Sequence, residues 1–296
     1  MRKSKIQVFI ENIVKTLLSI LKILLLTKFG VKSLKKKENA NNCIILGNGP
    51  SLSETVNQNI ELLQKIDCFA VNFFVKTDSF TKIKPRYYVI ISENYWSEGK
   101  IDINETGRQK VFEELASKTT WKMTLIVLAA AKTFNKNNWK QKIGKNQNID
   151  IEYVNITPIE GFKPFVRFCL KRNWGLPRPH NVLIPAIKAA TDYNYKNIFI
   201  VGADHSWLKD IYVGNDNRVY LSQKHFYDNN PVPEVMYDGT SNRVRNLADV
   251  LMKFVYSFKS YFVLKEYAES KNVRIFNSTP ISYIDAFDRK SLKEIQ

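Results

Sequence analysis

Residues 43–296 alternate between short apolar runs and longer segments in which apolar residues recur at helical spacing. The apolar runs predict strands at 43–46, 68–71, 86–91, 123–129, 149–154, 197–201 and 273–276. Helical spacing predicts helices over 52–65, 181–193 and about 243–270. Strands that alternate with helices form a largely parallel sheet with right-handed crossovers. The predicted fold class is therefore α/β, with a Rossmann-like, mostly parallel sheet and helices on both faces.

Polar residues follow four of these strands at the point where each strand ends. They are Asn48, Asn72, Ser92 with Asn94, and Asp204 with His205. Asparagine, aspartate and glycine also favour ordinary turns, so each position taken singly has that alternative interpretation. In open α/β sheets, however, ligands bind beyond the carboxyl ends of the strands. The convergence of four strand ends on small hydrogen-bonding groups favours a binding site at this edge.

The first strand of this domain is joined to the first helix by Gly47-Asn48-Gly49-Pro50-Ser51. The segment lacks the third glycine of the dinucleotide fingerprint and the Gly-Lys-Ser/Thr of the P-loop. Gly47 and Gly49 would let backbone amides approach a ligand at a helix N-terminus, which favours negative charge. Asn48 adds a donor and an acceptor, Pro50 suits a first helical turn, and a serine at 51 or 53 could cap the helix. These residues alone predict that an anion or a nucleotide binds after the first strand.

Residues 1–37 form a separate, basic segment in which apolar residues recur at helical spacing from Ile10 to Leu25. Lys15 and Lys22 interrupt the apolar run, so it contains no stretch of about 20 uncharged residues that would span a bilayer. We expect an amphipathic helix that lies on an anionic membrane surface. The alternative is a helix packed on the body of the protein or in a homo-oligomer. Residues 38–42 are interpreted as a polar linker into the domain at 43–296.

The positive charge is distributed unevenly along the chain. Residues 1–37 hold ten Lys or Arg and one acidic residue, Glu11, and so carry about half of the formal net charge of +17. No zinc-finger spacing, RNA-binding sheet signature or helix-turn-helix pattern accompanies this charge, so we predict no nucleic-acid partner. Acidic lipids and phosphorylated substrates explain the charge with fewer assumptions. Three scattered cysteines suggest small core residues and a reducing, cytoplasmic compartment.

All three histidines, His180, His205 and His225, lie within residues 180–225. Histidine is the usual general base near neutral pH. His205 follows Asp204 at a strand end, and His225 lies in the polar stretch 208–240, whose length is typical of a substrate lid. We predict His225 or His205 as a base and Asp204 as a group that binds ribose or orients a neighbour. The alternative for each histidine is an ordinary turn or helix-cap residue.

The sequence predicts no metal site. It has no convincing Asp-x-Asp, because Asp150-Ile151-Glu152 lies within an apolar, strand-like stretch. It also has no cluster of histidine and carboxylate residues at ligand spacing. Arginines at 172, 178, 243 and 245 flank the histidine-containing segments and could neutralise a phosphate or a carboxylate, although such arginines more often lie on a solvated surface.

Gly47-Asn48-Gly49-Pro50-Ser51-Leu52 after the first strand resembles the loop of the bacterial sialyltransferases of glycosyltransferase family 42 and of related motility-associated and polysaccharide-associated proteins. The resemblance continues in order over about residues 43–285. It includes Asn72, Asn94, Pro179-His180-Asn181-Val182, Gly202-Ala203-Asp204 and the segment 274–280. The chain departs from the family before the last long helix, where Val255 and Tyr256 stand near the place of the family's histidine base.

This resemblance implies a Rossmann-like, GT-A-like domain that uses a CMP-activated nonulosonic acid without a metal or another cofactor. It implies that the nucleotide and the donor sugar contact the residues Gly47, Asn48, Gly49, Pro50, Ser51, Asn72, Ser92, Asn94, Asn181 and Gly202. We therefore expect a glycosyltransferase that moves a sugar to a surface-glycan or lipid-linked acceptor on the inner face of the cell membrane. The alternatives are an enzyme that resembles the archaeal-type pterin diphosphokinases, which carry a similar loop, and a non-catalytic sugar-nucleotide-binding scaffold.

Overall fold

The computed structural model describes residues 4–34, 40–96, 105–134, 138–222, 226–227, 232–237 and 243–295. Its centre is an eight-stranded sheet in the order β11-β10-β6-β1-β2-β3-β4-β5, in which every neighbouring pair is parallel. The strands are β1 (Asn42–Leu46), β2 (Asp67–Val71), β3 (Tyr87–Ile90), β4 (Met123–Leu128), β5 (Ile149–Val154), β6 (Asn197–Val201), β10 (Arg274–Asn277) and β11 (Asp288–Arg289). The predicted α/β fold class is confirmed.

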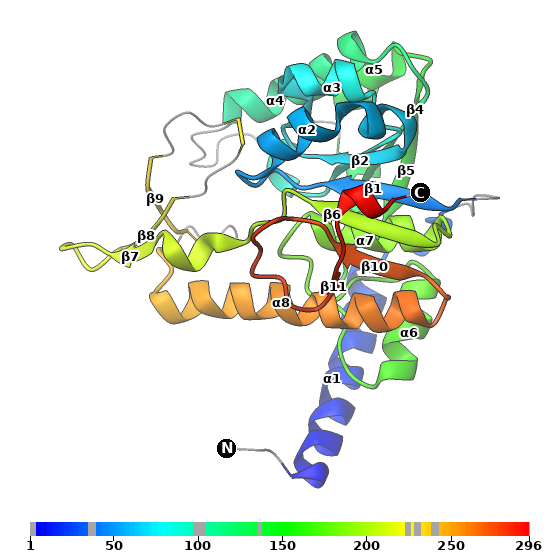
Figure 1. Ribbon diagram of the computed structural model, residues 1–296. Coiled ribbons are helices and arrows are strands. Elements are labelled where there is room, and N and C mark those ends of the chain that lie inside the picture. The colour runs from blue at the N-terminus through cyan, green and yellow to red at the C-terminus, as the bar shows by residue number, and fades with distance from the viewer. Residues whose placement is uncertain are drawn as a thin grey trace.

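Helices cover both faces of this sheet (Figure 1). One face is covered by α7 (Leu183–Asp192) and α8 (Leu247–Glu269), and the other by α2 (Leu52–Lys65), α3 (Asp78–Ile83), α4 (Glu105–Lys118) and α5 (Trp139–Gly144). The remaining helices are α1 (Lys5–Leu26) and α6 (Lys163–Lys171). The helices α3, α4, α5 and α6 and the strand β11 were not predicted; α3, α5 and β11 are too short for a clear apolar period.

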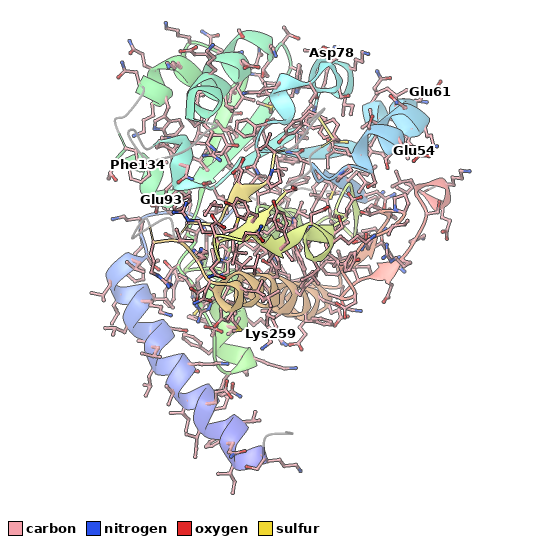
Figure 2. The ribbon with its side chains drawn as sticks, turned by 90° about the vertical axis from the view of Figure 1, so that its left-hand side faces the viewer. Glu54, Glu61, Asp78, Glu93, Phe134 and Lys259 are labelled. Atoms are coloured by element: carbon pink, nitrogen blue, oxygen red, sulfur yellow. The ribbon has the colours of Figure 1, made fainter. Side chains whose placement is uncertain are left out.

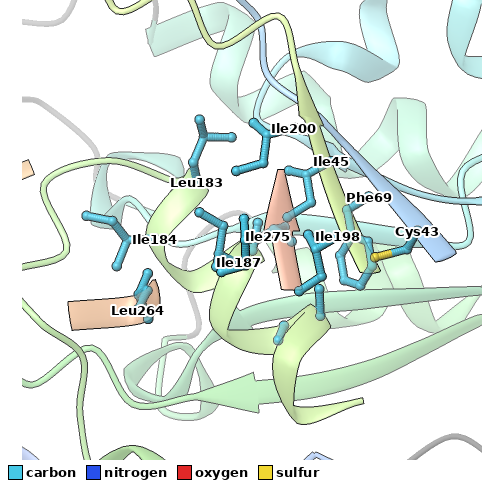
Figure 3. Close-up of a cluster of buried hydrophobic side chains, with 14 of the residues drawn as sticks. Cys43, Ile45, Phe69, Leu183, Ile184, Ile187, Ile198, Ile200, Leu264 and Ile275 are labelled. Atoms are coloured by element: carbon cyan, nitrogen blue, oxygen red, sulfur yellow. The ribbon is translucent and has the colours of Figure 1, made fainter. Parts of the chain in front are cut away.

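The two faces of each central strand belong to two different cores, because successive side chains point to opposite faces of the sheet. Cys43 and Ile45 of β1 pack with α7 and α8 (Figure 3), whereas Ile44 and Leu46 pack with α2. All four side chains are fully buried. The cysteines are free thiols and buried, as expected for small core residues. β1 also begins one residue earlier than predicted, so Asn42 belongs to the sheet and not to a linker.

A buried cluster of charges ties α7 to α8. The fully buried Lys188 Nζ lies 2.6 Å from Asp192 Oδ2, and Asp192 Oδ1 also accepts from Lys271 Nζ at 2.9 Å and from the Tyr267 hydroxyl at 2.6 Å. Burial would raise the pKa of Asp192, but the two lysines hold it below its ordinary value. Lys188 donates further to Asn173 Oδ1 at 3.2 Å, which joins the turn after α6 to the same network.

The predicted helix in residues 1–37 is present as α1, which extends away from the sheet in both views (Figure 1, Figure 2). The side that packs on the body is mostly polar, with Ile23 as its buried apolar residue. The Ser19 hydroxyl exchanges hydrogen bonds with the backbone of Glu160, the Thr16 hydroxyl accepts from the Phe162 amide at 3.1 Å, and the Thr27 hydroxyl donates to the Trp174 carbonyl at 2.7 Å.

The apolar side of α1 faces outward as a consequence. We call this surface the apolar face of α1; its large exposed side chains are Ile6, Val8, Phe9, Ile10, Ile13, Val14, Leu17, Leu18, Ile20, Leu21, Leu24, Leu25 and Leu26. Leu17 is 62% exposed and Leu24 66%. No helix among the described residues is long and apolar enough to cross a bilayer.

Candidate functional site

A cavity of about 230 Å³ lies at the carboxyl ends of β1, β2 and β6, where the strand-end pattern predicted a site. The loops after these strands form one wall, and the residues before and at the start of α7 form the second. The third wall comes from α8 and from a small antiparallel sheet that the sequence did not predict, made of β7 (Ile211–Val213), β8 (Val219–Leu221) and β9 (Glu234–Val235). This small sheet occupies part of the predicted lid at 208–240.

The loops after β1 and β6 are joined through their backbones. The amide of Gly47 donates to the Val201 carbonyl, and the amide of Gly49 donates to the Gly202 carbonyl, each at 2.8 Å. A Cβ atom on Gly47 would lie 2.5 Å from the Gly202 carbonyl oxygen, so no larger residue fits there. We expected these amides to face a ligand. They instead satisfy carbonyls of the neighbouring strand, and both glycines are needed for this close approach of two backbones.

Asp204 anchors the same loop from the β6 side. Its Oδ2 accepts from the Ser51 hydroxyl at 2.9 Å, and its Oδ1 accepts from the Ser51 amide at 3.3 Å. Ser51 precedes α2 but makes no side-chain cap, because its hydroxyl is used by Asp204. Burial raises the pKa of the Asp204 carboxyl, and the hydrogen bonds from Ser51 oppose that shift only in part. The sequence predicted Asp204 as a site residue, and the structure places it on the cavity wall.

Asn48 carries an acceptor that has no partner among the described residues. Its Nδ2 donates to the Val71 carbonyl at the end of β2 at 3.0 Å, which fixes the orientation of the amide. Its Oδ1 is buried and makes no hydrogen bond within the described part of the chain. A buried acceptor without a donor costs about 1–3 kcal/mol. Since Asn48 lines the cavity, a ligand donor would remove this cost.

Four further predicted residues divide into two pairs. Asn72 follows β2 in the left-handed region (φ 51°) and lines the cavity, as does Gly202 after β6. Ser92 and Asn94 follow β3 at the same edge of the sheet but are not among the residues that line the cavity. The strand ends were correctly placed, but β3 lies one strand further from the β1–β6 junction than β2 does.

His205 is buried on the cavity wall with only 7% of its surface exposed. The Oδ1 of Asn181 accepts from the Leu183 amide, so the Nδ2 of Asn181 faces His205 Nε2 at 3.3 Å and donates to it. The Tyr261 hydroxyl lies 2.6 Å from the same Nε2. Burial lowers the pKa of His205 to about 3, so the ring is neutral at neutral pH. Its accepting nitrogen is already occupied, which reduces its capacity to take a proton from a substrate.

Two further basic side chains line the cavity, and neither was predicted as a catalytic or binding residue. His180 precedes α7 and Lys253 lies on α8, and both line the cavity. Burial lowers the pKa of His180 to about 4, and Lys253, Arg178 and Arg245 add to the shift. Burial and Arg245 lower the pKa of Lys253. No sequence signal separated Lys253 from other lysines, because only the fold brings this turn of α8 to the carboxyl edge of the sheet.

The flanking arginines do not line the cavity. Arg178 pairs with Glu160 at 2.6 Å, and Arg243 pairs with Asp249 at 2.8 Å. His225 lies outside the described residues. Among the described residues no group of three or more histidine, cysteine, aspartate or glutamate side chains is placed to hold a metal ion.

Comparison with known proteins gives little beyond the fold. No protein-family model and no curated protein matches the chain. Among solved structures, the chain is similar to one described as a MAf glycosyltransferase from Magnetospirillum magneticum AMB-1, at 12% sequence identity and a TM-score of 0.48. The match covers 97% of this chain but only 39% of that one. A likeness this distant carries no argument about this chain.

The contact between the loops after β1 and β6 leads to a testable prediction at Gly49. A Cβ atom there would lie 2.0 Å from Asp204 Oδ2 and 2.7 Å from the Gly202 carbonyl oxygen, so Gly49→Ala should lower the free energy of unfolding by about 1–3 kcal/mol, the usual cost of overpacking. Urea unfolding measures this. Gly144→Ala is the matched control, because nothing lies within 4 Å of its Cβ position, and it should change stability by less than about 1 kcal/mol. Equal stability of the two variants would contradict the described loop contact.

Proposed function

We propose that this chain is a glycosyltransferase that binds a nucleotide-activated sugar in the cavity, with the nucleotide next to the loop Gly47–Ser51. The observation that carries the proposal is the buried Asn48 Oδ1, an acceptor that faces no donor among the described residues. Hydroxyl and amino groups of a nucleoside are donors of the required kind. Asn72, Asn181 and Gly202 line the same cavity and complete the proposed binding set. Ser92 and Asn94 are left out of it because they lie off the cavity wall.

The donor that we propose is a CMP-activated nonulosonic acid, on the strength of the loop's resemblance to the family 42 sialyltransferases. In the reaction, an acceptor hydroxyl oxygen forms a bond to the anomeric carbon while the bond from that carbon to the phosphate oxygen breaks. The phosphate oxygen keeps the electron pair and leaves as CMP. The hydroxyl proton passes to a base, and we propose a reaction that requires no metal ion. The acceptor is a surface-glycan or lipid-linked sugar.

A screen of nucleotides tests this proposal. Calorimetric titration of the whole chain with CMP, CDP, UDP, GDP and ATP, with and without magnesium, should show binding of CMP that does not depend on magnesium. Asn48→Ala removes the acceptor and should weaken CMP binding about tenfold or more, the size of a lost hydrogen bond in a buried site. Asn94→Ala is the control, because this asparagine also follows a strand but lies off the cavity wall.

The other outcomes of the screen are equally informative. An unchanged affinity of Asn48→Ala for CMP would show that the nucleotide does not bind at this loop. A preference for magnesium-ATP would replace the transferase with an enzyme of the pterin diphosphokinase type. Binding without turnover of any donor would leave a sugar-nucleotide-binding scaffold.

For the base we propose His225 in preference to His205. The Nε2 of His205 already accepts from Asn181 and lies against the Tyr261 hydroxyl, and its depressed pKa makes it a weak base at neutral pH. His225→Ala should therefore lower the rate of CMP release from the donor by about 100-fold or more, the usual contribution of a general base, and leave CMP affinity nearly unchanged. If His225→Ala keeps its turnover and His205→Ala loses it, the roles are reversed.

We propose that α1 attaches the protein to the inner, cytoplasmic face of an anionic membrane. The supporting observation is the reversed packing of the helix, in which hydroxyl groups contact the body and the apolar face of α1 is exposed. Lys5 and Lys28 are exposed near the two ends of the helix and can contact acidic head groups. Such a position would bring the enzyme to a lipid-linked acceptor.

Vesicle cosedimentation tests the attachment. The chain should sediment with vesicles of phosphatidylcholine and phosphatidylglycerol, and less with phosphatidylcholine alone. The double variant Leu17→Glu, Leu24→Glu should lose this binding and remain folded, because both side chains are exposed. Ile281→Glu is the matched control, since Ile281 is 73% exposed but lies far from α1 in sequence. If the double variant instead changes the mass in solution by light scattering and not the vesicle binding, the apolar face of α1 joins two copies of the chain.

A further inference from the structure

The proposed nucleotide site leaves two basic side chains of the cavity wall without a role. Lys253 lies on the third wall, in α8, and His180 lies on the second wall, in the segment before α7. The His180 ring lies 5.9 Å from the Tyr256 ring, one helical turn from Lys253, so the two elements meet at this point. We call the pair the cationic corner of the cavity, after the Lys253 ammonium group; His180, with a pKa of about 4, adds a neutral imidazole at neutral pH.

Lys253 lies in α8 beside buried residues and makes no ion pair with a carboxylate among the described residues. Its neighbours on the same side of α8 are Val250, Phe254 and Ser257, which are all buried. Within the described part of the chain no carboxylate oxygen lies within ion-pair distance of its ammonium group. The charged group that acts on Lys253 is a second cation, Arg245, and it opposes the charged form of the lysine.

Other basic groups around this wall are arranged differently. Arg178 is paired with Glu160 at 2.6 Å and lies over the Tyr256 ring at 4.4 Å. Arg245 Nε donates to the Tyr237 carbonyl at 3.1 Å. Among the described residues, Lys253 is therefore the lysine or arginine that lines the cavity, and Arg245 adds positive potential at Lys253 while Arg178 and Arg245 add it at His180. A partly buried ammonium group next to further cations is costly, and an anion between them would offset that cost.

We propose that Lys253, together with His180, forms a subsite that binds an anionic oxygen group of the ligand, either a phosphate or a sugar carboxylate. The inference rests on the proposed function only for the rest of the ligand, whose neutral nucleoside part would bind at Asn48. The two parts of the cavity then recognise different chemistry. The Asn48 side offers a hydrogen-bond acceptor to neutral donors, and the cationic corner selects for an acidic group. A neutral sugar nucleoside without an acidic group would leave Lys253 without a counter-charge.

The test uses the whole chain and four separate probes in calorimetric titrations. Inorganic pyrophosphate and CMP carry phosphate, N-acetylneuraminic acid carries a carboxylate, and cytidine is neutral. In Lys253→Met the affinity for those acidic probes that bind at Lys253 should fall about tenfold or more, while the affinity for cytidine should stay within about twofold. Lys253→Arg should retain part of the affinity because it keeps the charge. Lys259→Met is the matched control, since Lys259 lies on the same helix but on its exposed surface (Figure 2).

The pattern across the probes identifies the anion. Loss of pyrophosphate and CMP binding alone places a phosphate at Lys253, and loss of N-acetylneuraminic acid binding alone places a carboxylate there. Equal binding of every acidic probe by Lys253→Met and by the unaltered chain overturns the subsite, and so does a failure of the unaltered chain to bind any acidic probe. Failure of the proposed function is distinct, because cytidine and CMP would then bind independently of Asn48 while pyrophosphate still depended on Lys253.

A second measurement checks the placement of the corner without any ligand. Lys253 contributes to the low pKa of His180, so Lys253→Met should raise the pKa of His180 from about 4 toward its ordinary value. NMR titration of the imidazole signals measures this shift, and the same titration in Lys259→Met should match the unaltered chain. If the pKa of His180 is unchanged in a folded Lys253→Met variant, the two side chains do not interact, and the proposed cationic corner is wrong.

Discussion

The backbone contact between the loops after β1 and β6 is the constraint on which the site depends. Two amide-to-carbonyl hydrogen bonds of 2.8 Å join these loops, and Gly47, Gly49 and Gly202 allow an approach that no Cβ atom would permit. Asp204 then holds the Ser51 end of the loop. Asn48 stands between the two glycines, so its side chain is directed away from the contact and reaches the end of β2. The cavity lies where these three strand ends meet.

The second organising feature is the position of α8, which joins parts of the protein that are distant in sequence. Near one end, Tyr267 and Lys271 join the buried charge cluster around Asp192 and so fix the helix against α7. Near the other end, Phe254 packs with Val219 and Leu221 of the small antiparallel sheet. Lys253 lies beside this contact. The same helix therefore lines the cavity and supplies its lysine side chain, so the proposed charged subsite and the proposed nucleoside site lie on different elements.

Much of the architecture follows from local pattern. Alternating apolar runs and helical periods give the sequence of strands along the chain, and the parallel arrangement follows because every crossover except that from β10 to β11 contains a helix. The positions of Asn48, Asn72, Gly202 and Asp204 at the carboxyl edge also follow, since a polar residue after a buried strand has to lie at its end. The charged, amphipathic character of α1 is equally a property of adjacent residues.

Other features depended on contacts between residues far apart in the chain. Local periodicity shows that α1 has a polar side, but only the hydrogen bonds of Ser19 and Thr27 to residues near 160 and 174 show that this side is the packed one. The separation of Asn72 from Ser92 and Asn94 depends on which strands flank β1 in the sheet. Lys253 is one lysine in a long amphipathic helix until α8 is placed across the strand ends. The local pattern shows on which face of a helix or at which end of a strand a residue lies, because this depends on its near neighbours. Which of these faces and strand ends come together in a site is decided by the packing of the whole chain.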